Sequence, residues 1–248
     1  MKILLANPNT TVSVTERMTT VARAAASAGT EIVAVTGQTG VPYIATRAEA
    51  AVASRETMEL MANHAAGCDA AIVAAFADPG LGGAKEMLDI PVVGLAEAAM
   101  LTACMLGRRF SIVTFAQALG PWYREAVEYH LLTARLASIR CLDASFADIT
   151  NVQDELEDLL VELCARTQRD DEADVIILGG GPLAGLAARV KDRVAVPLVD
   201  CVAAAVRQVE ALVALAPRKA TAGTFRRPAS KPIVGVSDAL TRLFSGQP

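Results

Sequence analysis

An internal repeat constrains the fold of this chain more than any other feature. The segment Asp69-Ala-Ala-Ile-Val-Ala-Ala, which leads into a loop of Pro and Gly, matches Asp174-Val-Ile-Ile-Leu-Gly-Gly 105 positions later. Farther along, Pro91-Val-Val-Gly matches Pro197-Leu-Val-Asp in nearly the same register. Two copies in register predict two similar lobes related by a pseudo-twofold axis.

Within each copy, short apolar runs alternate with helical patterns. This alternation predicts an α/β fold in which each lobe has a mainly parallel sheet flanked by helices. In the first copy, strands are expected at residues 3–6, 31–35, 70–74 and 90–94, and helices at 12–28 and 48–66. We assign residues 1–96 plus 205–248 to the first lobe and 97–204 to the second, with the tail packing back on the first.

The repeat also predicts where a ligand would bind. Open α/β sheets bind ligands beyond the carboxyl ends of their strands, so two facing lobes would place two sets of strand ends around one cleft. The candidate loops are residues 7–11, 75–80, 114–121 and 179–182, with Thr114 at the start of the third.

The first loop, Asn7-Pro8-Asn9-Thr10-Thr11, offers amides, hydroxyls and backbone N–H groups at a helix start. Such groups suit a carboxylate or an imide carbonyl. Asn and Thr are also ordinary turn and N-cap residues, so a purely structural loop is the competing interpretation.

In the second loop, Phe76 is a candidate contact and Asp78 a candidate base. Asp78-Pro79-Gly80 is equally typical of a helix start, with Asp78 as the N-cap and Pro79 at the first helical position. The capping interpretation is favoured for Asp78.

The glycine-rich loop after the run 175–178 contains Gly179, Gly180, Gly181, Pro182 and Gly185. Its backbone amides suggest an anion site. With Asp200 farther on, it also imitates a dinucleotide fingerprint. Pro182 removes an amide where a pyrophosphate would bind, so nucleotide binding is disfavoured.

Other polar and aromatic residues give weaker signals. Trp122 and Tyr123 would either wall a pocket or pack inward at a helix start. The two histidines, His64 and His130, have no cysteine or carboxylate at metal-ligand spacing, so no metal site is expected. Arg226 and Arg227 are interpreted as a solvated basic pair.

Composition narrows the class of partner. The chain is 53% hydrophobic with a net charge of −4, which gives no general attraction for nucleic acid or an anionic membrane. Its five cysteines are widely spaced without a CxxC motif, and no uncharged apolar run is long enough for a membrane span. We therefore expect a cytoplasmic protein with reduced cysteines.

Taken together, these segments resemble the aspartate/glutamate/hydantoin racemase family, most closely its hydantoin and allantoin racemases. The resemblance is carried by the Asn7-Pro8-Asn9-Thr10-Thr11 loop, Asp78-Pro79-Gly80-Leu81, Pro91-Val-Val-Gly-Leu-Ala-Glu97, Phe110 to Thr114, Ile177-Leu178-Gly179 and Val196 to Asp200. It implies an isomerase of amino acid metabolism, without a cofactor, acting on a small hydantoin-like, allantoin-like or amino-acid-like substrate. It also implies a homo-oligomer.

The resemblance further implies a cysteine on each side of the cleft, one a thiolate and one a thiol, which exchange the α-proton on opposite faces. Those two positions are Ala75 and Gly180 in this chain, and neither side chain accepts a proton. We therefore expect little or no two-base racemisation. The alternatives are a one-base enzyme, like the single-cysteine arylmalonate decarboxylases of the superfamily, or a catalytically silent small-molecule binding protein. Substrate contacts are expected at Asn7, Pro8, Asn9, Thr10, Phe76, Thr114, Gly181 and Pro182.

Overall fold

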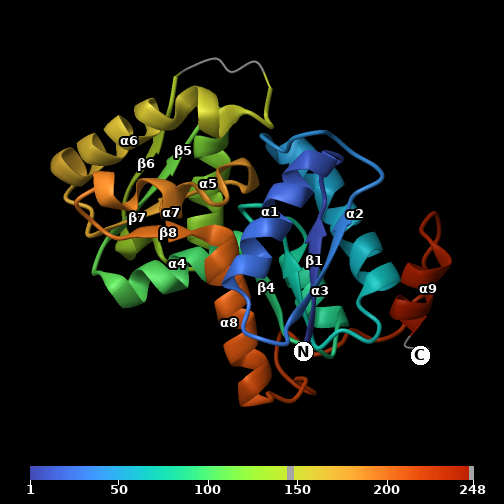
Figure 1. The fold of residues 1–248 in the computed structure, drawn as a ribbon. Helices are drawn as coiled ribbons and strands as arrows, with labels where there is room; N and C mark the ends of the chain where they lie inside the picture. Colours follow the sequence, from blue (N-terminus) through green and yellow to red (C-terminus); the bar gives the residue numbers. More distant parts are fainter. Residues whose placement is uncertain (144–147, 246–248) are drawn as a thin grey trace.

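Two parallel four-stranded sheets form the frame of the protein, one in each half of the chain (Figure 1). The computed structural model describes residues 1–143 and 148–245. The first sheet has the order β2-β1-β3-β4 and the second the order β6-β5-β7-β8, so corresponding strands occupy the same places. This equivalence confirms the two-lobe α/β prediction. The strands are β1 (Lys2–Asn7), β2 (Glu31–Thr36), β3 (Ala70–Val73), β4 (Val92–Gly94), β5 (Phe110–Thr114), β6 (Leu136–Cys141), β7 (Val175–Leu178) and β8 (Leu198–Asp200).

Helices cover both faces of each sheet, so the central strands are buried on both sides. Every residue of β3 (AAIV) and β7 (VIIL) is buried, which explains why these strands are continuous apolar runs. The helices are α1 (Val12–Ala25), α2 (Arg47–His64), α3 (Leu81–Met87), α4 (Leu95–Leu106), α5 (Leu119–Tyr129), α6 (Val152–Asp171), α7 (Leu186–Val190), α8 (Cys201–Leu215) and α9 (Asp238–Ser245), with 3₁₀ turns at Thr133–Arg135, Gly181–Leu183 and Lys191–Arg193. In the described part of the chain, no helix combines the length and apolarity needed to cross a bilayer.

Helix boundaries differ slightly from the sequence-based expectation. α1 ends at Ala25 rather than at residue 28, and α2 ends at His64 rather than at residue 66. The turns at Gly29 and Gly67 lie a few residues beyond the last helical residue. Both glycines have positive φ, which suits residues without a side chain. The start of α2 is fixed by a capping box, in which Thr46 accepts from the N–H of Glu49 and Glu49 accepts in return.

α4 and α8 pack against each other between the two sheets (Figure 1). One hydrophobic cluster extends through both lobes, and it includes small side chains from both helices, such as Ala99, Ala103 and Ala205. The domain boundaries predicted at 96/97 and 204/205 fall inside these two helices. The hydrophobic core is therefore continuous across both predicted boundaries.

The carboxylate of Glu210 attaches α8 to the first lobe. Its oxygens accept hydrogen bonds from the Ser27 N–H (2.8 Å), the Ser27 hydroxyl (2.8 Å) and the Thr30 hydroxyl (2.7 Å). Burial by itself raises the pKa of Glu210, but these hydrogen bonds and the charge of Arg207 outweigh it and lower the pKa below its ordinary value.

We expect Glu210 to make folding stability sensitive to acid. Because its pKa is lower in the folded than in the unfolded state, its contribution is present above the unfolded pKa and is lost as pH falls through the folded pKa. Glu210→Gln should therefore reduce stability by roughly 2 kcal/mol at pH 7 and flatten the pH dependence below about pH 5. Urea unfolding from pH 3 to 8 measures both effects. An unchanged pH dependence in the variant would contradict this role.

Candidate functional site

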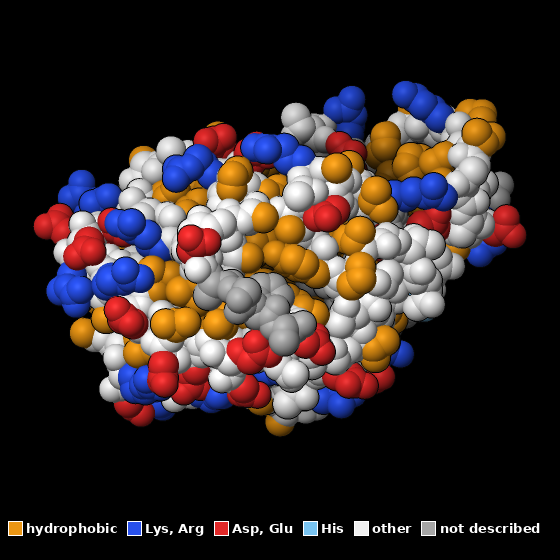
Figure 2. All heavy atoms as spheres, turned by 90° about the horizontal axis from the view of Figure 1, so that it is seen from above, with side chains coloured by type: hydrophobic (Ala, Val, Ile, Leu, Met, Phe, Trp, Pro, Cys, Tyr) orange, Lys and Arg blue, Asp and Glu red, His pale blue; other side chains and the backbone are white. Residues whose placement is uncertain are grey.

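A cavity opens between the lobes at the carboxyl ends of both sheets. The cavity is narrow: the space inside it that the centre of a water-sized sphere can reach is about 30 Å³. Seen from this end, hydrophobic side chains gather in the middle of the face and charged side chains lie mostly around them (Figure 2). The lining residues are Asn9, Val14, Pro42, Tyr43, Ile44, Ala74, Ala75, Phe76, Phe115, Leu119, Trp122, Tyr123, Ile149, Gly180, Gly181 and Pro182.

Ala75 and Gly180 both lie on this cavity, although 105 residues separate them in sequence. Ala75 follows β3 of the first lobe, and Gly180 follows β7 of the second. The structure thus brings together the two positions that the repeat made equivalent. Phe76, Gly181, Pro182 and Asn9 line the same cavity, as the sequence predicted.

Asn7 supports the cavity without lining it. Its side chain is fully buried, and its Nδ2 donates to Asn9 Oδ1 (3.0 Å) and Thr15 Oγ1 (2.9 Å). Asn9 Oδ1 also accepts from the Thr11 N–H (3.0 Å). With its oxygen engaged by these two donors, Asn9 has its Nδ2 hydrogens left for another acceptor.

Pro8, Thr10 and Thr114 are likewise outside the lining set. The Thr10 N–H donates to the Val41 carbonyl (3.1 Å), which holds the loop between β2 and α2. Thr114 is fully buried and its hydroxyl donates to the Gly179 carbonyl (2.8 Å), so it fixes the start of the glycine-rich loop. Thr10 and Thr114 thus hold loops beside the cavity, and none of the three residues lines it.

Asp78 caps a different helix from the one expected. α3 begins at Leu81, after Gly80 in a left-handed conformation, so Pro79 is not its first residue. The Asp78 carboxylate instead accepts from the N–H groups of Ala96 (2.9 Å) and Glu97 (2.7 Å) at the start of α4. Positive φ angles at Ala77 (81°) and Asp78 (57°) turn the loop toward α4, which local capping preferences do not predict.

The environment of Asp78 is buried and rich in charge, but it lies outside the cavity lining. Burial raises the pKa of Asp78, against the lowering effect of hydrogen bonds from His130, Ala96 and Glu97. His130 Nε2 lies 3.5 Å from Asp78 Oδ2, and its Nδ1 lies 3.9 Å from Glu97 Oε1. The carboxylate that the sequence offered as a candidate base is therefore engaged in holding the loop.

In the second lobe, the corresponding helix α8 is capped by Asp200, which directly precedes that helix. It accepts from the N–H groups of Val202 and Ala203 (both 2.9 Å) at the start of α8, and from the Gly185 N–H (2.6 Å). The acid that imitated a ribose-binding residue is thus fully occupied by capping. This arrangement gives no support to dinucleotide binding.

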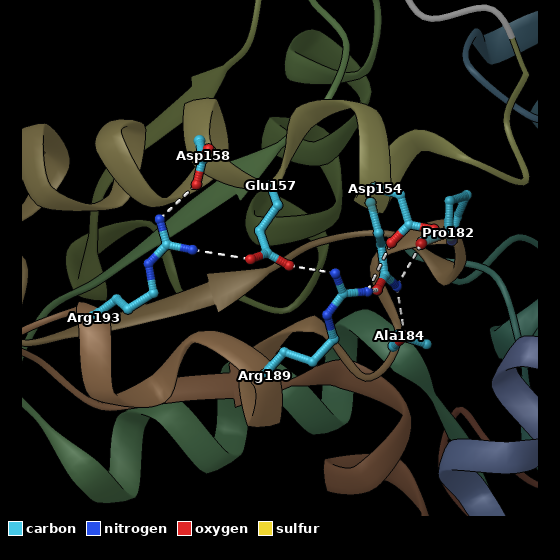
Figure 3. Close-up of polar contacts among 8 residues, drawn as sticks. Asp154, Glu157, Asp158, Pro182, Ala184, Arg189 and Arg193 are labelled. Atoms are coloured by element: carbon cyan, nitrogen blue, oxygen red, sulfur yellow. Dashed lines mark hydrogen bonds and ion pairs between the residues drawn. The ribbon is translucent and has the colours of Figure 1, made fainter.

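α6 holds the glycine-rich loop from the outside. The buried Gln153 side chain donates to the carbonyls of Pro182 (2.8 Å) and Ala184 (2.6 Å). Beside it, Arg189 and Arg193 pair with acidic residues of α6, including Asp154 (3.0 Å to Arg189) and Asp158 (2.6 Å to Arg193) (Figure 3). These contacts fix the loop that presents Gly180 to the cavity.

Aromatic rings form much of the cavity wall. Trp122 and Tyr123 of α5 both line it, and the Tyr123 ring packs on Phe76 with centroids 4.7 Å apart. Desolvation raises the pKa of Tyr123 well above its ordinary value, despite a hydrogen bond with Thr114. Desolvation, with smaller effects of Glu49 and Cys141, raises the pKa of Tyr43 to about 12. Both phenols are therefore protonated at neutral pH.

The five cysteines do not supply a base to the cavity. All are free thiols and none is among the lining residues. Burial raises the pKa of every one of them, to about 12 for Cys164. The Sγ of Cys201 lies 4.0 Å from the Gly180 carbonyl oxygen, but this thiol is buried.

The remaining candidates lie elsewhere. His64 is exposed on α2. Arg227 contacts Asp89 (3.2 Å) and the Leu243 carbonyl (3.3 Å), so it helps attach α9 rather than standing free in solvent. Among the described residues, no group of three or more His, Cys, Asp or Glu side chains is arranged to hold a metal ion.

Sequence reasoning missed the contribution of the loop between β2 and α2. Pro42, Tyr43 and Ile44 line the cavity, and the Tyr43 ring lies 5.9 Å from that of Phe115 in the other lobe. The strand-end rule, applied to Thr36 at the end of β2, would have included this loop.

Comparisons with known proteins agree with the geometry. The family model described as Asp/Glu/Hydantoin racemase matches residues 3–209. A hydantoin racemase from Paenarthrobacter aurescens is 32% identical, covering 93% of this chain and 99% of the relative. One from a Pseudomonas species is 30% identical over 98% of both chains. The solved allantoin racemase from Klebsiella pneumoniae superposes with a TM-score of 0.91 at 34% identity, covering 97% of this chain and 98% of that one.

Proposed function

The chain belongs to the Asp/Glu/hydantoin racemase family, and from that premise we propose that it binds a small uncharged cyclic amide of the hydantoin type in the cavity between its lobes. We propose further that it performs little or no two-base racemisation of that ligand. The relatives named hydantoin racemase and allantoin racemase support the ligand class.

The observation that carries the ligand class is the absence of charge in the cavity wall. Among the described lining residues there is no Lys, Arg, His, Asp or Glu, and the polar side chains are Asn9, Tyr43, Trp122 and Tyr123. A bound aspartate or glutamate would bury an ammonium and two carboxylates without an oppositely charged side chain beside any of them, which is unfavourable by several kcal/mol per ion. A neutral ring with carbonyl and N–H groups avoids that penalty.

Hydrogen-bonding groups for such a ring are present. Asn9 Oδ1 accepts hydrogen bonds from Asn7 and Thr11. The Asn9 Nδ2 hydrogens make no hydrogen bond within the described residues, so they can donate to a ligand carbonyl. The backbone N–H groups of Ala75, Phe76 and Gly181 donate to no other residue in the described part of the chain. Donors of this kind at a strand end stabilise negative charge on a ligand oxygen. These groups support binding of a carbonyl-rich ring even without catalytic side chains.

A base for removing the α-proton is the missing component. Ala75 and Gly180 occupy the expected base positions, and the pKa values of the two lining tyrosines are raised by burial. A positioned acid or base typically contributes 10²–10⁴-fold to the rate. The proposed function is therefore binding without efficient inversion. The one-base decarboxylase-like alternative stays a prediction, as do a homo-oligomeric state and a cytoplasmic location.

Trp122 provides a direct test, because it is the only tryptophan in the chain and lines the cavity. We expect 5-benzylhydantoin to change the tryptophan fluorescence with saturation, and L-aspartate to leave it unchanged. Chiral chromatography with the same protein in heavy water should show no more inversion or deuterium uptake than buffer.

Ala75→Leu serves as the blocked-cavity control, since its larger side chain fills space at the wall. It should lose the fluorescence response while keeping a folded circular dichroism spectrum. Saturable binding of aspartate alone would contradict the ligand class. Rapid inversion of the hydantoin by the unaltered chain would contradict the missing base.

A further inference from the structure

We propose that Tyr123 is a proton donor to the bound ligand from the second-lobe side of the cavity, where its hydroxyl lies beside the place that a side chain at residue 180 would occupy. This inference rests on the proposed function, because it assumes that the cavity holds the ligand's α-carbon. It assigns to the chain one half of a two-sided proton transfer, with the acid present and the opposing base absent.

The geometry of Gly180 carries the assignment. A Cβ atom at Gly180 would lie 3.4 Å from Tyr123 Oη and 3.1 Å from Phe115 Cε1. The backbone there has φ +124°, a conformation that side-chain-bearing residues rarely adopt. The hydroxyl of Tyr123 therefore stands beside the site from which a second-lobe side chain would reach the ligand.

Tyr123 also packs against the first-lobe loop that contains Ala75. It lies on α5 of the second lobe, and its ring packs on Phe76, the residue next to Ala75. Both Ala75 and Tyr123 line the cavity. A ligand between them would have the first-lobe position on one face and the phenol on the other.

The protonation state fits an acid rather than a base. Tyr123 is 2% exposed, and burial keeps its phenol protonated far above neutral pH. A phenol in a water-poor site can deliver a proton to a carbanion but does not remove one from carbon at pH 7. A chain that has Tyr123 but no opposing base is therefore expected to lack two-base activity.

Ala75→Cys supplies the missing half and makes the inference testable. Its thiolate would break the ligand's α C–H bond and form S–H, leaving the electron pair delocalised into the adjacent carbonyl. Tyr123 would then form a new C–H bond on the opposite face and lose its phenolic proton to the ligand. Water protonates the phenolate, and the thiol returns its proton to water, so one turnover inverts the centre without net consumption.

The experiment compares full-length Ala75→Cys with Ala75→Cys/Tyr123→Phe, using optically pure 5-benzylhydantoin in heavy water. Ala75→Cys should invert the centre with one deuterium incorporated per inversion. The double variant should lose at least 10²-fold in inversion rate, while exchange with retention, returned by the thiol itself, persists. Tyr129→Phe is the matched control, because Tyr129 lies on the same helix but is exposed and outside the cavity. It should leave inversion unchanged.

Each outcome decides the question. Equal inversion with and without the Tyr123 hydroxyl, or exchange only with retention in Ala75→Cys, overturns the role of Tyr123 and leaves ligand binding intact. Absence of any exchange in Ala75→Cys, with the Trp122 fluorescence response preserved, also overturns it, because the ligand's α-carbon then does not lie between the two residues. Loss of all hydantoin binding in the unaltered chain instead refutes the proposed function itself.

Discussion

Gly94→Ala is expected to destabilise the protein by about 3–5 kcal/mol, although alanine suits the backbone at that position. Gly94 has an ordinary φ of −102°, so the cost is steric rather than conformational. A Cβ there would lie 2.1 Å from Asp78 Cγ. The variant must displace the carboxylate that accepts two hydrogen bonds from α4, and bonds to a charged group are worth roughly 1.5–3 kcal/mol each.

A double-mutant cycle by urea unfolding isolates this contact. In an Asp78→Ala background the side chain that Gly94 accommodates is gone, so Gly94→Ala should cost less than about 1 kcal/mol. Gly29→Ala is the control for conformational strain alone, because Gly29 has φ +83° with open space around it. It should cost about 1 kcal/mol. An equal cost for Gly94→Ala in both backgrounds would show that Asp78 does not fill the space.

Gly180→Cys is expected to cost about 2–4 kcal/mol, whereas Ala75→Cys should be nearly neutral. At Gly180 the positive φ contributes strain of about 1–3 kcal/mol, and the Phe115 ring, whose Cε1 would lie 3.1 Å from a Cβ, would have to shift slightly to admit it. Ala75 already carries a Cβ and lines the cavity. Thermal unfolding of both variants measures the asymmetry.

Gly180→Ala adds only the Cβ, so it separates the effect of the Cβ from that of the thiol. It should account for most of the loss of stability. The asymmetry means that reinstating thiols on both sides does not restore a symmetric site. Gly180→Cys added to Ala75→Cys should therefore lower stability without a matching gain in inversion. A Gly180→Cys variant as stable as the unaltered chain would show that the loop adapts freely.

Equivalent positions in the two lobes solve the same structural problem with different residues. Gly94 and Asp200 both precede a central helix, but the capping carboxylate comes from Asp78 in the first lobe and from Asp200 itself in the second. Each carboxylate also ties a cavity loop to α4 or α8. The repeat predicted that the positions correspond, but not that the cap had moved to another residue.

The two-lobe α/β architecture and the position of the cavity could be predicted from the amino-acid pattern alone. Both follow from local regularities: apolar runs buried in parallel strands, a repeat in register, and loops at strand ends that must share one edge. Ala75, Gly180, Asn9 and Phe76 were therefore placed at the cavity without any knowledge of contacts.

How those positions are used depends on contacts between distant parts of the chain. Asp78 caps α4, Tyr43 lines the cavity, and the Tyr123 hydroxyl approaches Gly180. Each of these contacts joins residues that are far apart in the chain. The left-handed turn at Ala77 and Asp78 and the conformation of Gly180 are likewise stabilised by surroundings rather than by local preference. The local sequence pattern determines where helices and strands form. The packing of distant elements determines which side chains come into contact and which of them could exchange protons with a ligand.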